Sequence, residues 1–432
     1  MGKFETGLLL LPLTRAIMNK IGKYSIGVGD RFGHQAEAQL KAILMATELG
    51  VEIIPVWNKS YREHSILHST PQDTRRAADM AVRALNYKGQ YFVDADHINL
   101  SNVDDFIDYC DFFTIDVAEH IGKHADKHSI EKFIANNKKY LGKLILPESD
   151  ISFEITREKI AEIAHKYLYA VKEVAKIYRH IVSAKGTDNF VAEVSMDEVN
   201  VPQTPMDIFF ILSALAAEKV VIQTIAPKFT GQFNKGVDYV GNLAQFAREF
   251  EQHVLVIKHA ANEFNFPNSL KLSIHSGSDK FSIYKEINRI IKKHQAGLHL
   301  KTAGTTWLEE VAGLAIASSD TLEIVKEIYA IALNRFDELC APYATVINID
   351  RSKLPLIEEV KKWDGEKFAN TLRHNPAHPD YNPHFRQLIH VSYKVAFEKS
   401  NLFINGLKKY AELVGQQVTD NLLNRHIKPI FL

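Results

Sequence analysis

Residues 91–98, with the sequence YFVDADHI, combine a strand-like start with an ionisable end. The first residues are aromatic or β-branched and suit a buried strand, and Asp94, Asp96 and His97 follow where such a strand would leave its sheet. Two carboxylates beside an imidazole offer ligands for a divalent metal and a base next to it. The structural alternative is that Asp94 caps the following helix and His97 packs in a loop.

The same change from apolar to polar residues recurs at the ends of other predicted strands. These ends carry Asp30 and Arg31, Asp116 and His120, Glu193, Asp197 and Glu198, Lys228, His275, Ser276 and Asp279, and His299 and Lys301. An isolated histidine is more often a hydrogen-bonded core residue than a ligand. Three of them on three strands, His97, His275 and His299, would suit Zn, Mn, Ni or Fe and leave positions open for a substrate.

Lys301 lies two residues after His299, so on a regular strand both side chains point to the same face. Lys301 could bind a substrate carboxylate. Because a buried lysine needs a partner, a structural ion pair with Glu193 or Asp197 is an equal alternative.

Eight predicted strands alternate with helical segments. The strands cover residues 24–33, 51–57, 90–97, 112–120, 189–198, 220–226, 270–279 and 297–306. Thr204 before Pro205 predicts a helix that begins at Pro205, with Thr204 as its N-cap. This alternation predicts a (β/α)8 TIM barrel, an α/β fold whose active site lies at the carboxyl ends of the strands.

The predicted barrel carries two additions within one domain of residues 1–432. Residues 124–185 lack strand signals and predict a helical insertion, and residues 336–432 predict a helical C-terminal extension. A doubly wound open sheet is the alternative architecture. Residues 27–33 argue against it, because their glycine spacing does not match a dinucleotide-binding turn.

Composition excludes several classes of protein. The 432 residues include 52 basic and 52 acidic side chains, without the basic stripe that nucleic-acid binding requires. Two cysteines exclude a disulfide framework, so we expect a cytoplasmic protein. The apolar run at residues 7–13 is too short to span a membrane and is expected to pack on the fold. A homo-oligomer is compatible with the sequence.

Seven blocks of sequence resemble a known family. They are GDRFG at 29–33, DADH at 94–97, FTID at 113–116, EVSMDE at 193–198 with PQTP at 202–205, KGVDY at 235–239, HSGSDKFS at 275–282 and HLKTAGT at 299–305. In this order they resemble the bacterial tagaturonate/fructuronate epimerase family, from about residue 24 to beyond residue 393. Several blocks, HSGSDKFS above all, are long enough to be specific.

The resemblance implies a metal-dependent barrel enzyme that inverts carbon 3 of a 2-ketohexuronate and so interconverts D-tagaturonate and D-fructuronate. A metal bound by His97, His275 and His299 would polarise the carbonyl at carbon 2 and stabilise the enediolate formed when the neighbouring carbon loses its proton. Asp96 is then the expected base. The expected substrate-binding residues are Asp30, Arg31, Lys228, Lys235, Ser276 and Lys301.

One position departs from the family pattern, in which a glutamate precedes the lysine of the KGVD block. This chain has Asn234 there, and an asparagine cannot exchange a proton at neutral pH. The chain would then use another acid, such as Glu193 or Glu198, act on a different sugar acid, or have lost the reaction. A related uronate or ketose isomerase and an inactive sugar-acid-binding protein therefore remain as alternatives.

Overall fold

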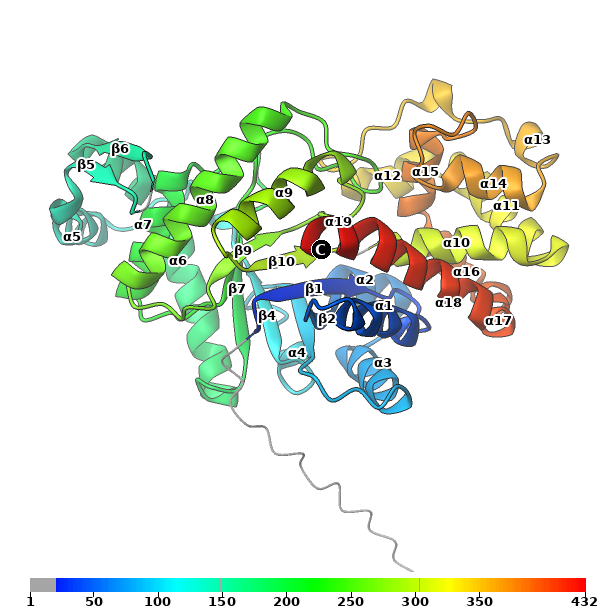
Figure 1. Cartoon of the computed structure of the whole chain (residues 1–432), viewed down its shortest axis with the longest axis horizontal. Helices are drawn as coiled ribbons and strands as arrows, with labels where there is room; N and C mark the ends of the chain where they lie inside the picture. Colours follow the sequence, from blue (N-terminus) through cyan, green and yellow to red (C-terminus); the bar gives the residue numbers. More distant parts are fainter. Residues whose placement is uncertain (1–20, 148, 303) are drawn as a thin grey trace, which may run out of the picture.

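The computed structural model describes residues 21–147, 149–302 and 304–432, so the apolar run at residues 7–13 lies outside the described residues. Eight parallel strands close into a barrel in the order β1-β10-β9-β8-β7-β4-β3-β2 (Figure 1). They are β1 (Tyr24–Gly29), β2 (Ile54–Ser60), β3 (Phe92–Ile98), β4 (Phe112–Asp116), β7 (Val191–Ser195), β8 (Thr224–Ala226), β9 (Lys271–Ile274) and β10 (Leu298–Lys301). The predicted (β/α)8 barrel is confirmed.

The inside of the barrel changes from apolar to polar along the strands. Asp94, Thr114 and Glu193 all reach the Lys301 side chain, so these positions of β3, β4 and β7 face the interior. The residues two positions earlier face the same way, because side chains alternate along a strand. They belong to a buried apolar cluster of Ile21, Ile54, Val56, Phe92, Phe112 and Val191. The amino-terminal end of the barrel is therefore filled with hydrocarbon, and the carboxyl end with ionisable groups.

Helices surround the barrel. They are α1 (Ala36–Glu48), α2 (Tyr61–Leu67), α3 (Pro71–Ala84), α4 (Asp104–Ile107), α6 (Arg157–Lys185), α7 (Pro205–Ala217), α8 (Leu243–Glu263), α9 (Phe281–Lys293) and α10 (Thr305–Ala317). The prediction for α7 is confirmed, because the Thr204 side chain accepts a hydrogen bond from the Asp207 N–H and Pro205 is the first helical residue.

The segment 124–185 differs from the prediction of a purely helical insertion. The short turn η1 (Ala118–His120) precedes the segment. The segment itself contains α5 (Lys127–Asn136), the turn η2 (Lys138–Tyr140) and a two-stranded antiparallel hairpin of β5 (Gly142–Ile145) and β6 (Ser152–Ile155). Apolar and polar residues alternate over both strands, a signal that the surrounding lysine-rich helical sequence concealed. The following helix α6 packs on β4 and α7, so it serves as the barrel's own crossover helix.

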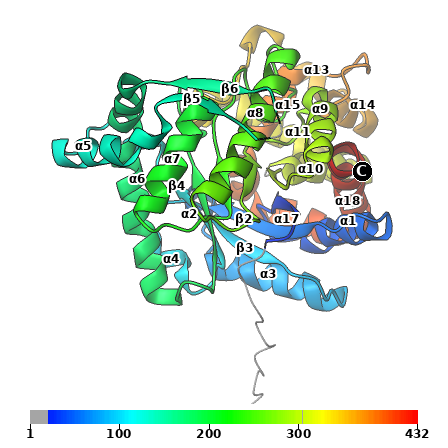
Figure 2. The ribbon, with the colours of Figure 1, turned by 60° about the vertical axis from the view of Figure 1, so that its left-hand side comes forward.

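The C-terminal extension forms a second core at the side of the barrel opposite the hairpin (Figures 1 and 2). It follows α11 (Ser319–Asn334) and comprises α12 (Phe336–Cys340), η3 (Ala341–Tyr343), η4 (Arg351–Lys353), α13 (Ile357–Val360), α14 (Gly365–Leu372), α15 (Pro383–Val391), α16 (Tyr393–Glu398), α17 (Ser400–Lys409), α18 (Ala411–Asp420), the π-helix η5 (Asn421–Ile427) and α19 (Lys428–Phe431). Helix α10 joins the two cores, because it packs against strand β1 of the barrel and against α11, α14 and α18. Over the described residues, no helix has both the length and the apolar character needed to cross a membrane.

A buried ion pair fastens the loop after β9 to this extension. The Arg386 guanidinium lies 2.9 Å from Asp279 Oδ1, and His374 Nδ1 lies 3.3 Å from the same oxygen. The Asp279 N–H also donates to His426 Nε2 over 3.1 Å. Burial acts to raise the pKa of Asp279, but Arg386 and His374 outweigh it and hold this pKa well below its usual value.

We expect the substitution Arg386→Met to destabilise the protein by roughly 3–5 kcal/mol, because it leaves the Asp279 carboxylate buried without its cation. The lowered pKa of Asp279 means that its contribution is present above the pKa of an unfolded aspartate, about 4, and disappears as the pH falls toward the folded value. Urea unfolding at pH 7 and pH 4 would measure both effects. Unaltered unfolding of Arg386→Met at pH 7, or a larger loss for Arg386→Met combined with Asp279→Asn, would contradict this account.

Candidate active site

Strand β3 is irregular where it enters the site. Its register with β4 shifts between Ala95 and Ile98, and His97 has a φ of 55°. On a regular strand the neighbours Asp96 and His97 would point to opposite faces. The bulge turns the His97 side chain, so both residues line one cavity of about 530 Å³, called here the Asp96 cavity. A left-handed histidine costs free energy, and such strain is concentrated at functional sites.

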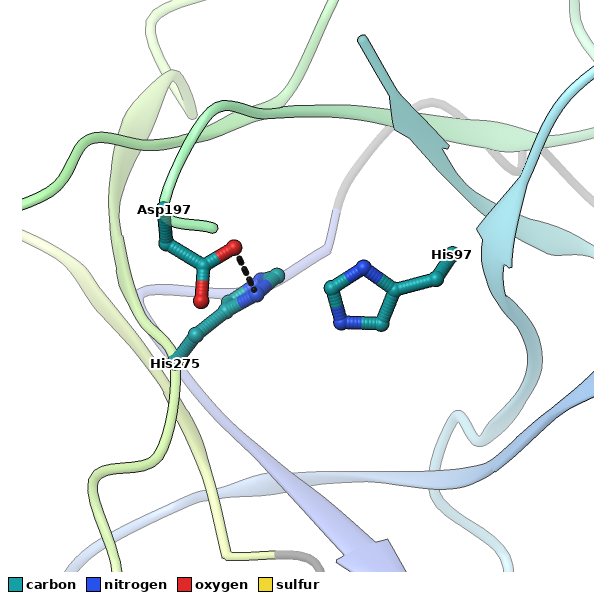
Figure 3. Close-up of side chains that lie close together, drawn as sticks. All are labelled: His97, Asp197 and His275. Atoms are coloured by element: carbon teal, nitrogen blue, oxygen red, sulfur yellow. Dashed lines mark ion pairs between the residues drawn. The ribbon is translucent and has the colours of Figure 1, made fainter. Parts of the chain in front are cut away.

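Three side chains from different strand ends meet at the mouth of the barrel (Figure 3). One ligand atom from each of His97, Asp197 and His275 lies within 4.8 Å of the others. The His275 Nδ1 atom is 3.1 Å from Asp197 Oδ1, and the centroids of the two imidazole rings are 5.3 Å apart. Two imidazole nitrogens and a carboxylate oxygen form a donor set that suits a divalent transition metal and leaves further positions open.

Two further carboxylates orient the histidines from behind. Asp116 Oδ2 lies 3.0 Å from His97 Nδ1, which leaves His97 Nε2 available. Glu193 Oε1 lies 2.6 Å from His275 Nε2, which leaves His275 Nδ1. Carboxylates that hold the second ring nitrogen are the usual support of metal-ligating histidines. The residues present therefore fit a metal ion.

The two imidazoles are basic because carboxylates surround them. Burial acts to lower the pKa of His97, but Asp96 and Asp116 outweigh it and raise this pKa well above its usual value. For His275, burial is likewise outweighed, chiefly by Asp197, and the pKa rises to about 9. Both rings are thus protonated and paired without a metal, and a bound cation would take the place of those protons.

Lys301 lies beneath this group and holds three carboxylates. Its Nζ atom is 2.8 Å from Asp94, 2.7 Å from Asp96 and 3.1 Å from Glu193. Thr114 Oγ1 is a further neighbour at 2.6 Å. The lysine is 3% exposed and forms the ion pair with Glu193 that the sequence analysis gave as the alternative to substrate binding, whereas Asp197 pairs with His275.

The pKa values of Asp94 and Asp96, the two aspartates beside Lys301, are shifted in opposite directions. Burial raises the pKa of Asp94 to about 7, although Lys301 opposes that effect. Burial also acts to raise the pKa of Asp96, but the charges of Lys301 and His97 outweigh burial and lower this pKa to about 2. Asp96 is therefore an ionised carboxylate at neutral pH, beside a candidate metal ligand and able to accept a proton.

His299 lies apart from the three-residue group. Its Nδ1 atom is 2.9 Å from Ser25 Oγ, and its ring lies beside Phe112 with centroids 5.3 Å apart. Burial lowers the pKa of His299 to about 3. The structure thus brings together two of the three predicted ligand histidines, and the third member of the group is Asp197 rather than His299.

The other predicted residues divide between two cavities that flank the group. Lys235 and Arg31 line the Asp96 cavity with His97. Lys228, Asn234 and Ser276 line a second cavity of about 450 Å³ with Asp197 and His275, called here the Lys228 cavity. Glu193 is buried between Lys301 and His275.

Asp30 stands outside both flanking cavities. Its carboxylate accepts from the N–H groups of Gly33 and Gln35 at 2.8 Å and 2.6 Å, so it stabilises the turn before α1. It lines a separate cavity of about 1440 Å³ between α1, α3 and the C-terminal helices. The position of Asp30 therefore indicates a structural role.

Sequence reasoning did not connect several residues to the candidate site. Asp116 and Asp197 were recognised only as polar strand ends, because their partners follow from the bulge in β3 and the turn after β7. Glu198, which the sequence analysis named as a possible acid, lines both flanking cavities. Tyr343 belongs to the C-terminal extension, where no sequence signal connects it to the barrel mouth.

Comparisons of the sequence with known proteins match one family over most of the chain. Residues 9–429 match a family model described as tagaturonate epimerase. The tagaturonate/fructuronate epimerase of Thermotoga maritima is 31% identical over 424 residues, which cover 93% of this chain and 80% of that protein.

Solved structures share the fold. The native crystal structure of the fructuronate-tagaturonate epimerase of Cohnella laeviribosi has a TM-score of 0.78 and 23% identity, covering 96% of this chain and 83% of that one. A glycerol complex of that enzyme gives a TM-score of 0.78 and 24% identity over 94% and 81% of the two chains.

The position of His299 generates a test with a matched pair of variants. We expect His275→Ala to lose stoichiometric metal, because it removes one of three candidate ligands. His299→Gln should keep its metal, because that ring bonds to Ser25 outside the group. Plasma mass spectrometry of both purified variants would measure metal content. Metal retained by His275→Ala, or lost by a folded His299→Gln, would contradict the assignment.

Proposed function

This chain belongs to the tagaturonate epimerase family, and on that premise we propose that it interconverts D-tagaturonate and D-fructuronate with a divalent metal. The observation that carries the proposal is the group of His97, Asp197 and His275 with the ionised Asp96 beside it. Zn, Mn, Ni and Fe all accept such a mixture of nitrogen and oxygen donors.

A metal held by these three residues would polarise the ketone of the substrate and stabilise the negative charge that develops on its oxygen. The protein's own part is to fix the ligands. Asp116 holds His97 and Glu193 holds His275, so the two rings are oriented before a substrate arrives.

The chemistry depends on which carbon is inverted. Both sugar acids carry the ketone at carbon 2 and the carboxylate at carbon 6, and they differ at carbon 4, which is carbon 3 when the chain is counted from the carboxylate. One carbon therefore separates the inverted centre from the ketone. Removal of a carbon-bound proton next to the ketone would not invert this centre, so we revise the expected proton abstraction.

Cleavage of the bond between carbons 3 and 4 accounts for the inversion without an oxidant. A base removes the proton of the carbon 4 hydroxyl, and the electrons of the broken bond move toward the ketone oxygen. Carbon 4 becomes a planar aldehyde, which can turn and be attacked again on its other face. Re-formation of the bond then returns a proton to the new hydroxyl, so atoms and electrons balance.

Asp96 is the base in this proposal. It lines the same cavity as His97, and its low pKa keeps it ionised at neutral pH. Lys301, 2.7 Å away, holds the carboxylate in place. Lys301 is therefore a positioning residue rather than a group that contacts the sugar.

The inverted hydroxyl lies on the other side of the substrate and needs its own proton donor. Glu193 is unsuited, because it is buried and Lys301 and His275 outweigh that burial and hold its pKa well below the usual value. Asn234 lines the Lys228 cavity but carries no exchangeable acid. Glu198 lines both cavities, so we assign it this role.

One experiment separates the proposal from its alternatives. Tagaturonate and the metal-loaded protein would be followed by NMR in deuterated water. Fructuronate that keeps hydrogen on carbon 4 supports the bond-cleavage mechanism. Deuterium on carbon 4 would contradict that mechanism and indicate direct proton exchange at this carbon. Exchange at carbon 1 without fructuronate indicates an isomerase. Binding without any conversion indicates an inactive homologue, the alternative that Asn234 favours.

We expect Asp96→Asn to lower kcat by roughly two to four powers of ten while metal stays bound, because it removes the general base but no ligand. Coupled measurements of turnover and metal content would test this. Wild-type turnover in the variant would exclude Asp96 as the base.

Glu198→Gln should also lower kcat, by roughly two powers of ten, because the proton donor on the opposite face is lost. Glu119→Gln is the matched control, since Glu119 lines only the Asp96 cavity. Equal effects of the two substitutions would show that Glu198 acts only through the charge of the cavity.

A further inference from the structure

We propose that Lys235 recognises the substrate carboxylate, so that the sugar acid lies with its acid end in the Asp96 cavity and carbon 1 toward the Lys228 cavity. This inference rests on the proposed function and adds a direction of binding and a residue that selects acids over neutral sugars.

Most cations near the site already have partners. Lys301 is buried among three carboxylates. The Arg31 guanidinium lies 3.0 Å from Glu63 Oε1, donates to the His390 carbonyl and lies over the Tyr393 ring at 4.0 Å. These contacts occupy the Lys301 ammonium and the Nε and Nη1 atoms of Arg31, so a substrate carboxylate would compete with bonds that are costly to lose in a buried environment.

Lys228 and Lys235 are different. Both are half-buried, and within residues 21–147, 149–302 and 304–432 neither side chain has an ion-pair or hydrogen-bond partner. Each lines a different cavity, Lys228 beside Asp197 and His275, and Lys235 beside Asp96 and His97. A carboxylate therefore has two candidate sites, on opposite sides of the metal group.

The position of the proposed base, Asp96, favours one of these two carboxylate sites. The ketone belongs at the metal group, and the carbon whose hydroxyl loses a proton lies between the ketone and the carboxylate. Asp96 lines the cavity of Lys235 and not that of Lys228. A substrate that presents its hydroxyl to Asp96 must therefore continue toward Lys235.

The surroundings of Lys235 favour this role. Its backbone N–H donates to the Val346 carbonyl over 2.8 Å, which holds the lysine against the C-terminal extension. Arg31 and Arg62 line the same cavity and add positive potential. The carboxylates that also line it, Glu63, Asp96, Asp116, Glu119 and Glu198, offset that potential, so the ammonium group itself and not the overall charge of the cavity supplies the contact. A carboxylate there would meet one free ammonium group in a position that the fold has already fixed.

The opposite cavity suits the neutral end of the sugar. Besides Lys228 and apolar residues such as Phe229 and Phe233, its lining includes the amide and hydroxyl side chains of Asn200, Gln232, Asn234, Ser276, Thr345 and Asn348. Such groups donate and accept hydrogen bonds, as a hydroxymethyl group and its neighbours do.

The test compares acid and neutral ligands on the metal-loaded protein. Galactonate has the carboxylate and hydroxyls but no ketone, and galactitol is its neutral counterpart. Isothermal titration calorimetry would measure both on the wild type, Lys235→Met, Lys235→Arg, Lys228→Met and the exposed control Lys362→Met. Methionine keeps the apolar stem, and metal content and melting temperature would be measured alongside.

We expect Lys235→Met to weaken galactonate binding about 10- to 100-fold, the value of a charge-assisted hydrogen bond, with a much smaller effect on galactitol. Lys235→Arg should recover most of the loss. The proposal is overturned if Lys228→Met carries the loss instead, if neither variant does, or if the wild type does not prefer galactonate.

The two proposals fail in distinguishable ways. A wild type that binds galactonate through Lys235 but does not convert tagaturonate would refute the reaction and keep the binding direction. Conversion of tagaturonate with a KM that Lys235→Met leaves at the wild-type value would refute only the direction.

Discussion

One ammonium group among three carboxylates governs the arrangement of this site. Lys301 Nζ lies within 3.1 Å of Asp94, Asp96 and Glu193, in a place almost without solvent. Burying these charges is expensive, and only close, complete pairing offsets the cost. Because the same ammonium holds Asp96 and Glu193, it fixes the proposed base and, through Glu193, the ring of His275. A displacement of any of these groups would leave a buried charge without its partner.

Only a closed barrel brings these groups together, because they come from β3, β7 and β10, which are far apart in sequence. Parallel register sets Thr114 opposite Glu193 and Asp94 opposite Asn58, so the polar positions form a layer across the interior. The apolar layer beneath excludes water from below. Low solvent access strengthens each ion pair and makes each lost partner more costly.

Simple periodicity predicted the parts of this design that repeat, namely eight strands with polar carboxyl ends and the Thr204 cap. It could not predict departures from regularity. His97 reaches the site through a bulge, which a strand pattern does not reveal, and Asp197 replaces His299 because His299 points into a deeper layer beside Ser25. The β5–β6 hairpin was hidden in a helix-rich composition. Tyr343 and Arg386 act across more than a hundred residues of intervening chain, so their roles depend on tertiary packing alone.

The C-terminal extension is more than a cover for the barrel, because it stabilises strained backbone at the site. His97, Ser276 and Asp279 all have positive φ angles, a conformation that side chains other than glycine rarely adopt. Such strain persists only where surrounding contacts over-determine it. Arg386, His374 and His426 supply those contacts at Asp279, four residues beyond His275. The folding of the extension is thus coupled to the position of the candidate metal ligand His275. Local unfolding of the extension would displace this residue before the barrel itself unfolds.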